Sequence, residues 1–171
     1  MMKDTTRLIA EMDAQIRSDK AKAWILQASP RIYRLFDALR DERIGNDDVW
    51  KVTRYKNEIL SGHIGLIWMA GKEAGIYALA RITSNPKLLV DSPASTSHWV
   101  LEKDKSQEKL RVKIKYVLRF VDNPLKKIQL KGTIGLEDLS IMKWWRATNF
   151  RVKKDEWFII SNLIKEKLEM R

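Results

Sequence analysis

Tryptophan is the residue type in this chain that points most plainly to a binding site, and the surroundings of its members differ. The chain contains seven tryptophans. Trp68 and Trp157 lie in apolar, periodic segments, which is typical of residues that pack in a core. Trp50 and Trp99 lie in polar, loop-like surroundings instead. Because an exposed indole can stack on a nucleobase, these two residues are candidate walls of a base-binding site.

Basic side chains surround the aromatic candidates and suit contacts with a phosphate backbone. They lie close in sequence to Trp50, to Trp99 or to the adjacent pair Trp144 and Trp145, and are Lys51, Arg54, Lys56, Lys103, Lys143, Arg146 and Arg151. The alternative for each is a solvated face that serves solubility alone. Adjacent tryptophans on a strand would face opposite sides of a sheet, and the sequence does not say which of the pair faces inward.

The overall charge favours the same class of partner. The chain has 171 residues, with 33 Lys and Arg against 22 Asp and Glu, and a formal net charge of +11. A field of that sign collects polyanions before any specific contact forms, so nucleic acid is the leading partner. An anionic membrane would attract the same charge, but no apolar run is long enough to span a bilayer and no signal core opens the chain. We therefore expect a cytoplasmic protein.

The residues that most enzymatic chemistry requires are few in this chain. It has no cysteine and only two histidines, His63 and His98, which excludes a disulfide framework, a thiol nucleophile and a histidine-rich or cysteine-ligated metal site. Neither a Gly-rich phosphate loop nor a Ser/His/Asp arrangement stands out. We expect a binding domain without cofactor, metal or catalytic residues, and not an enzyme.

The periodicity of apolar residues predicts one domain of mixed helices and strands. Helical spacing predicts helices over residues 5–20 and 155–170, a helix bearing Ile32, Leu35, Phe36 and Leu39 on one face, and a helical turn over residues 137–140. Apolar or alternating runs predict strands over residues 23–29, 64–70, 75–82, 110–117 and 150–152. Residues 45–48 are expected to form a loop, and residues 84–107 a long one of the kind that usually has a function.

Four segments, in this order, resemble the EVE domain and the related YTH domain, which share a PUA-like fold. They are Trp24-Ile25-Leu26-Gln27-Ala28-Ser29, Asp48-Val49-Trp50-Lys51-Val52, Ser97-His98-Trp99-Val100-Leu101 with the basic strand that follows, and Arg146-Ala147-Thr148-Asn149-Phe150-Arg151-Val152. The resemblance covers about residues 22–168. It implies an α+β fold, a PUA-like twisted small β-barrel of five to six strands flanked by helices. Residues 1–20 would then be an N-terminal amphipathic helix packed on the barrel, and residues 21–171 the modified-base-binding domain.

The same resemblance implies roles for individual residues. Trp50 and Trp99 occupy the places of the cage tryptophans that hold a flipped, modified base in YTH domains. Gln27 and Ser29 occupy the strand end that contacts the base edge. YTH domains carry Lys-Ser there, whereas this chain has Gln27-Ala28-Ser29-Pro30, so the preference for a particular base does not transfer.

Three functions follow as alternatives. Domains of this kind serve as DNA-specificity modules of McrBC-type modification-dependent restriction systems, in which a nucleotide-hydrolysing motor domain is fused to the module and the nuclease is a separate subunit. An RNA-binding PUA-like module that reads modified RNA would use the same cage and basic face. A small-molecule or protein-interaction module would use its tryptophans for packing and its charge for solubility. We favour DNA over RNA as the partner.

Overall fold

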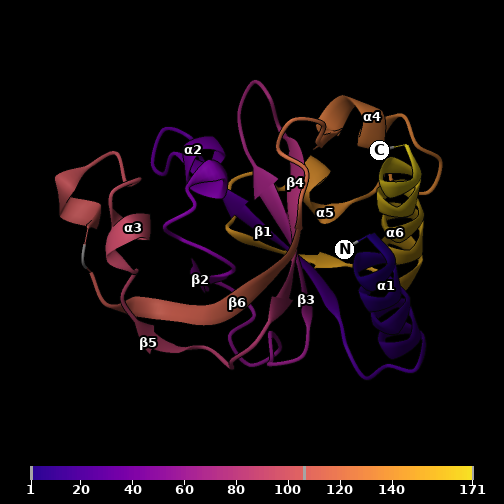
Figure 1. Ribbon diagram of the computed structural model, residues 1–171, viewed down its shortest axis with the longest axis horizontal. Helices are drawn as coiled ribbons and strands as arrows, with labels where there is room; N and C mark the ends of the chain where they lie inside the picture. Colours follow the sequence, from indigo (N-terminus) through magenta and orange to yellow (C-terminus); the bar gives the residue numbers. More distant parts are fainter. Residues whose placement is uncertain (1, 106, 171) are drawn as a thin grey trace.

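The computed structural model describes residues 2–105 and 107–170, and this part of the chain forms one twisted eight-stranded sheet with helices on both of its sides (Figure 1). Six strands follow the order β2-β6-β4-β3-β1-β8, while β5 pairs with β6 and β7 with β4. Their bounds are β1 (Ala23–Ala28), β2 (Asp47–Lys51), β3 (Ile64–Met69), β4 (Gly75–Ile82), β5 (Lys87–Leu89), β6 (Lys109–Arg119), β7 (Leu125–Lys126) and β8 (Asn149–Val152). Only the β1–β3 pair is parallel among these described ladders.

The burial of each strand follows its residue pattern. Every residue of β3 is buried, as expected for a central strand covered on both faces. In β6, Val112 and Ile114 point into the core while Lys113 and Lys115 face solvent, which matches the alternation in the sequence. Irregular register within β3–β4 and β4–β6 increases the local twist, which bends the sheet into a half-barrel.

A buried asparagine joins the two edge strands of this curled sheet. The Asn149 side chain, fully buried at the start of β8, accepts hydrogen bonds from the backbone N–H of Thr53 (2.8 Å) and Arg54 (3.2 Å). Its amide nitrogen donates to the carbonyl oxygen of Lys51 at 3.0 Å. Backbone groups beyond the end of β2 are thereby satisfied by a side chain instead of a strand, and these hydrogen bonds link the two edges of the half-barrel.

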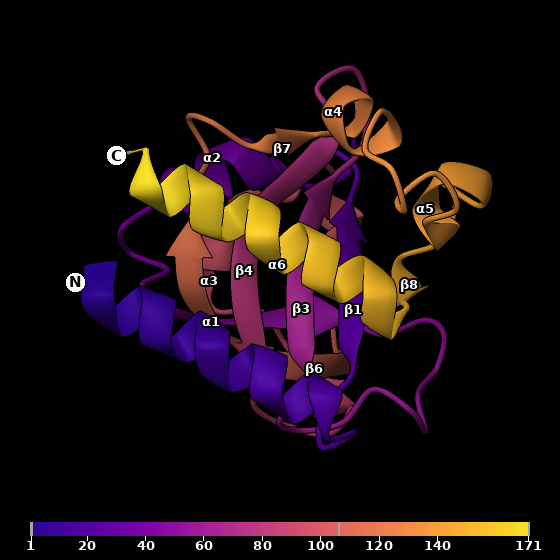
Figure 2. The same cartoon turned by 90° about the vertical axis from the view of Figure 1, so that its right-hand side faces the viewer.

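Two long helices cover the outer face of the sheet. Helices α1 (Met2–Arg17) and α6 (Lys154–Glu169) lie side by side and antiparallel across it (Figure 2). Their apolar residues, among them Met12 and Ile160, share one core with Trp68. None of the helices in the described part of the chain is long and apolar enough to cross a bilayer. The shorter helices are α2 (Leu35–Arg40), α3 (Pro93–Thr96), α4 (Lys127–Lys131), α5 (Ser140–Lys143) and the 3₁₀ turn η1 (Glu102–Asp104).

The elements missed by the sequence pattern depend on distant partners. Residues 45–48 were expected to be a loop, but β2 begins at Asp47 because the strand pairs with β6, more than sixty residues away. The expected long loop over residues 84–107 contains β5, α3 and η1. Trp144 and Trp145 do not lie on a strand: they follow α5 in a turn, and both are exposed.

Candidate nucleic-acid interface

A pocket opens at the end of β1, and residues of β2 also line it. Its volume is about 170 Å³, smaller than the roughly 300–1,000 Å³ of sites for drug-sized ligands, so it suits one small ring system. Residues from distant parts of the chain provide its lining: Gln27, Ala28, Ser29, Ile32 and Tyr33; Asp48, Val49, Trp50 and Lys51; Asp91 after β5, Trp99 after α3 and Arg111 on β6; and Arg146, Ala147 and Thr148. The curl of the sheet brings these segments together.

Trp50 and Trp99 both line this pocket, but they are held in different ways. Trp50 lies on β2, pairs in register with Val112 and is only 6% exposed, so its ring also belongs to the barrel interior. The expectation that it lies in a loop was wrong. Trp99 is half-buried in the segment after α3, and its ring centroid lies 5.0 Å from that of Tyr33.

Backbone hydrogen bonds place Trp99 over the pocket. The segment after β1 and the segment after α3 meet in a short antiparallel contact, in which Arg34 N–H donates to the His98 carbonyl and Val100 N–H donates to the Ile32 carbonyl, both at 2.9 Å. The indole N–H of Trp99 donates to Asp91 Oδ2 at 2.5 Å, which fixes the orientation of the ring. Two loops therefore hold Trp99 as firmly as a strand would.

Partly buried acidic groups line the pocket, and the sequence patterns did not single them out. Asp48 accepts hydrogen bonds from the hydroxyls of Ser95 and Tyr116, each at 2.9 Å. Burial raises the pKa of the Asp48 carboxyl above its usual range, and the charge of Asp91 raises it further. Asp91 forms an ion pair with the buried Arg111 at 3.3 Å.

Some of these missed residues left a trace in the sequence. Asp48 stands two residues before Trp50, within a segment that carries the family resemblance, and Asp91 lies in the loop whose length indicated a function. Arg111 lies in the basic strand that belongs to another of these segments, whereas Tyr33 carried no such signal, because only the closing of the sheet brings it to the pocket.

The two residues expected at the base edge lie in the pocket wall with different hydrogen-bonding capacity. The Gln27 amide nitrogen donates to the carbonyl oxygens of Trp145 (2.9 Å) and Ala147 (2.6 Å). Its amide oxygen is therefore the group that remains for a ligand. Ser29 accepts two backbone hydrogen bonds at its carbonyl, and its hydroxyl has no partner among the described residues.

Of the seven cationic residues singled out, two line the pocket itself. Lys51 Nζ lies 5.5 Å from the centre of the Trp99 ring. Burial lowers the pKa of Lys51, and the nearby charge of Lys109 lowers it further, so this ammonium gains from an anionic partner. The Arg146 guanidinium stacks over the Trp145 ring at 4.8 Å.

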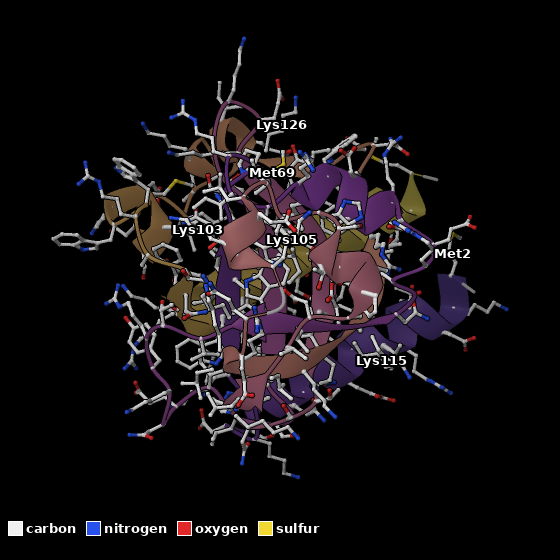
Figure 3. The ribbon with its side chains drawn as sticks, turned by 90° about the vertical axis from the view of Figure 1, so that its left-hand side faces the viewer. Met2, Met69, Lys103, Lys105, Lys115 and Lys126 are labelled. Carbon is white, nitrogen blue, oxygen red and sulfur yellow. The ribbon has the colours of Figure 1, made fainter. Side chains whose placement is uncertain are left out.

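The other five lie outside the pocket lining, and three of them already have partners. Arg151 forms an ion pair with Glu58 at 2.6 Å, Lys143 pairs with Asp138 at 3.2 Å, and Arg54 lies over the ring of its neighbour Tyr55. Lys56 and Lys103 are exposed. Figure 3 shows Lys103 with Lys105 on the face formed by α3 and η1, while α5 projects from the edge of that face.

The remaining signals concern packing and metal binding. The expectation that Trp68 and Trp157 pack in the core is confirmed, since they are 1% and 0% exposed. Within residues 2–105 and 107–170, no group of three or more His, Asp or Glu side chains is placed to hold a metal ion.

Fold and pocket together define a PUA-like α+β domain whose curled sheet closes around an aromatic pocket with acidic groups in its wall. The EVE domain model matches residues 22–163, and the chain therefore belongs to the EVE domain family. Helix α1 lies outside the matched range. No curated protein sequence matches the chain.

Solved structures share this fold at low sequence identity. A protein from Leishmania major is 19% identical, with a TM-score of 0.61, covering 86% of this chain and 96% of its own. A Pseudomonas putida protein is 22% identical, with a TM-score of 0.56, covering 82% and 98%. The human THYN1 protein, solved in complex with DNA containing 5-methylcytosine, is 13% identical, with a TM-score of 0.56, covering 84% and 97%. These likenesses support the PUA-like fold.

Proposed function

We propose that this EVE-domain protein is a binding module that takes one modified base of DNA into the pocket between Trp50 and Trp99. The observation that carries the proposal is the composition of that pocket. Two indoles, hydrogen-bonding groups on Gln27 and Ser29, and the cation Lys51 converge from separate segments on a cavity suited to one ring system. A flipped base needs these three things: a stacking surface, groups that read its edge, and a neutralised phosphate.

The energies involved support such a role. Extruding a base from a duplex costs a few kcal/mol, and stacking on an aromatic side chain contributes about 1–3 kcal/mol per base. Burial of a methyl-sized group adds only about 0.8 kcal/mol. The methyl group alone therefore gives modest discrimination, and stronger selectivity requires a hydrogen bond that an incorrect base leaves unsatisfied.

Asp48 extends the expected set of edge contacts. A carboxylate accepts a hydrogen bond from the exocyclic amino group of cytosine, and Asp48 lies in the pocket wall with Gln27 and Ser29. The structural neighbour bound to DNA with 5-methylcytosine makes that base the first ligand to test.

We further propose, from the resemblance noted in the sequence, that the module supplies DNA specificity to a modification-dependent restriction system in the cytoplasm. The motor and the nuclease would then be provided by other parts of that system. This role predicts that the chain alone neither cleaves DNA nor hydrolyses nucleotides.

Binding to matched oligonucleotides tests the proposal. Duplex DNA with one 5-methylcytosine, one N6-methyladenine or neither is compared with RNA of the same sequence, by fluorescence anisotropy at several salt concentrations. We expect tighter binding to one of the modified DNA duplexes. Equal affinity for all duplexes would contradict base recognition, tighter binding to modified RNA would favour an RNA reader, and no binding at low salt would exclude nucleic acid as the partner.

A further inference from the structure

The adjacent residues Trp144 and Trp145 are exposed beside the pocket and play no part in its lining. Their exposed fractions are 73% and 58%, whereas Trp24, Trp68 and Trp157 are at most 1% exposed. Arg146, the next residue, belongs to the pocket wall. Exposed aromatic side chains next to a binding site usually mark part of an interaction surface, because burying an indole against a partner contributes a large apolar area.

The backbone that carries these two indoles is firmly held. Trp144 N–H donates to the Ser140 carbonyl at 3.0 Å, and Ala147 N–H donates to the Trp144 carbonyl at 3.4 Å, which together form a tight turn. The Gln27 side chain ties this turn to the end of β1 through the Trp145 and Ala147 carbonyls. The indoles therefore extend from a fixed support whose other end is the pocket wall.

The charges around the pair suit DNA as the occupant. The Arg146 guanidinium lies over the Trp145 ring, so an aromatic face and a cation are presented together. Two other strongly exposed apolar residues, Ile128 (81%) and Ile134 (89%), lie on or after α4 and are absent from the pocket lining. Trp144 and Trp145 thus differ from these exposed apolar residues in their position next to the pocket and in the guanidinium stacked on the Trp145 ring.

We propose that Trp144 and Trp145 form a wedge that stacks on the duplex bases flanking the flipped nucleotide; the inference rests on the function proposed above. When a base leaves the helix, its neighbours lose a stacking partner, and apolar side chains inserted at a base step replace it. One continuous segment, residues 144–148, then supplies both the wedge and part of the pocket wall. The pocket selects the base, and the wedge stabilises the duplex from which that base is taken.

The test uses the full chain and a duplex with one 5-methylcytosine, or whichever modified base the wild type prefers. Trp144→Ala, Trp145→Ala and the double variant are compared on this duplex and on one with a mismatch opposite the modified base. We expect a loss of affinity of roughly 5- to 150-fold per residue that stacks on the paired duplex. The loss should be of similar size on the mismatched duplex, because the mismatch lowers the cost of flipping but does not change the stacking that the wedge supplies once the base is out.

Control variants separate stacking from general apolar contact. Trp145→Phe should retain most of the affinity, and Ile134→Ala should bind as the wild type does. Melting temperatures should be unchanged in all of these variants, because the side chains are exposed.

The outcomes distinguish the wedge from the function on which it rests. A wild type that does not discriminate the modified base would contradict the proposed function. A discriminating wild type with a double variant of equal affinity would overturn the wedge alone. A loss confined to one of the two duplexes would also overturn it, as would loss of self-association without loss of DNA binding, measured by sedimentation.

Discussion

Two indole–carboxylate contacts with nearly the same chemistry lie on opposite sides of the sheet. On the helical side, Trp157 Nε1 donates to Asp13 Oδ1 at 2.9 Å, and Lys165 pairs with the same carboxylate at 2.6 Å. On the pocket side, Trp99 Nε1 donates to Asp91 Oδ2 at 2.5 Å, and Arg111 pairs with that carboxylate. Both are partly desolvated triads of an indole, a carboxylate and a cation.

The two triads differ in what covers the ring. Trp157 is fully buried in the core shared by α1, α6 and the sheet, so its contact with Asp13 satisfies polar groups inside a packed interior. Trp99 is only half-buried and borders the cavity. An indole held by a carboxylate is therefore not in itself a sign of a ligand site. The free space next to the ring distinguishes the two.

The largest effect is expected on the packed side. Trp157→Ala removes a fully buried side chain and leaves Asp13 without its indole donor. A large-to-small change of this kind lowers the free energy of unfolding by about 3–5 kcal/mol. Urea unfolding measures it, and the folded fraction should keep its preference for the modified base. A variant as stable as the wild type would show that this triad does not support the fold.

On the pocket side the effect should be on binding. Trp99→Ala removes one stacking surface, which contributes about 1–3 kcal/mol per base, and should abolish the preference for the modified base while leaving most of the salt-sensitive binding. Oligonucleotide titrations measure both. If the variant still discriminates, Trp99 is not a wall of the base site.

Replacing Trp50 should affect both stability, as expected for Trp157, and base preference, as expected for Trp99. Because its ring is 6% exposed and part of the barrel interior, Trp50→Ala should lower both stability and base preference. Trp50→Phe keeps an aromatic ring and should restore much of the stability. Melting temperatures and the ratio of affinities for modified and unmodified duplexes, measured on the same samples, separate the two contributions.

Replacing a single cationic side chain should have a smaller effect on DNA affinity. Arg146 lines the pocket, so Arg146→Ala should weaken binding about equally for modified and unmodified DNA and reduce the salt slope by about one unit. Arg151 is held by Glu58 and should change binding less when replaced by alanine. Affinities at several salt concentrations compare the two variants, and equal losses would mean that the ion pair opens on binding.

The smallest expected effect is on the pH dependence of stability, through a tryptophan whose indole N–H donates to a histidine. Trp24 Nε1 donates to His63 Nδ1 at 3.0 Å, and burial lowers the pKa of His63, assisted by the charge of Lys22. A histidine with a lowered pKa contributes stability that is complete above its ordinary pKa of 6.5 and decreases as the pH falls toward the folded value. Unfolding free energies should therefore decrease gradually below about pH 6.5. The non-titrating His63→Gln variant should lack this component.

Elements whose signals are local could be predicted from the residue pattern alone. The amphipathic pattern over residues 5–20 corresponds to α1, the apolar runs correspond to β1, β3 and β4, and the alternation over residues 110–117 corresponds to β6. Side-chain periodicity follows directly from helix and strand geometry, so one strand or helix suffices to reveal it. Trp50 and Trp99 were selected on a different local signal, a tryptophan in a polar stretch of sequence.

Which of the selected residues lie together at one pocket depends on the fold as a whole. β2 forms because β6 pairs with it, and the curl of the sheet brings Tyr33, Asp48 and Arg111 to one cavity. Burial also turned Trp50 into a core residue, and ion pairs engaged Arg151 and Lys143. These outcomes depend on contacts between residues far apart in the chain. Local sequence patterns carry no information about which distant residues come into contact, because those contacts arise only when the sheet curls.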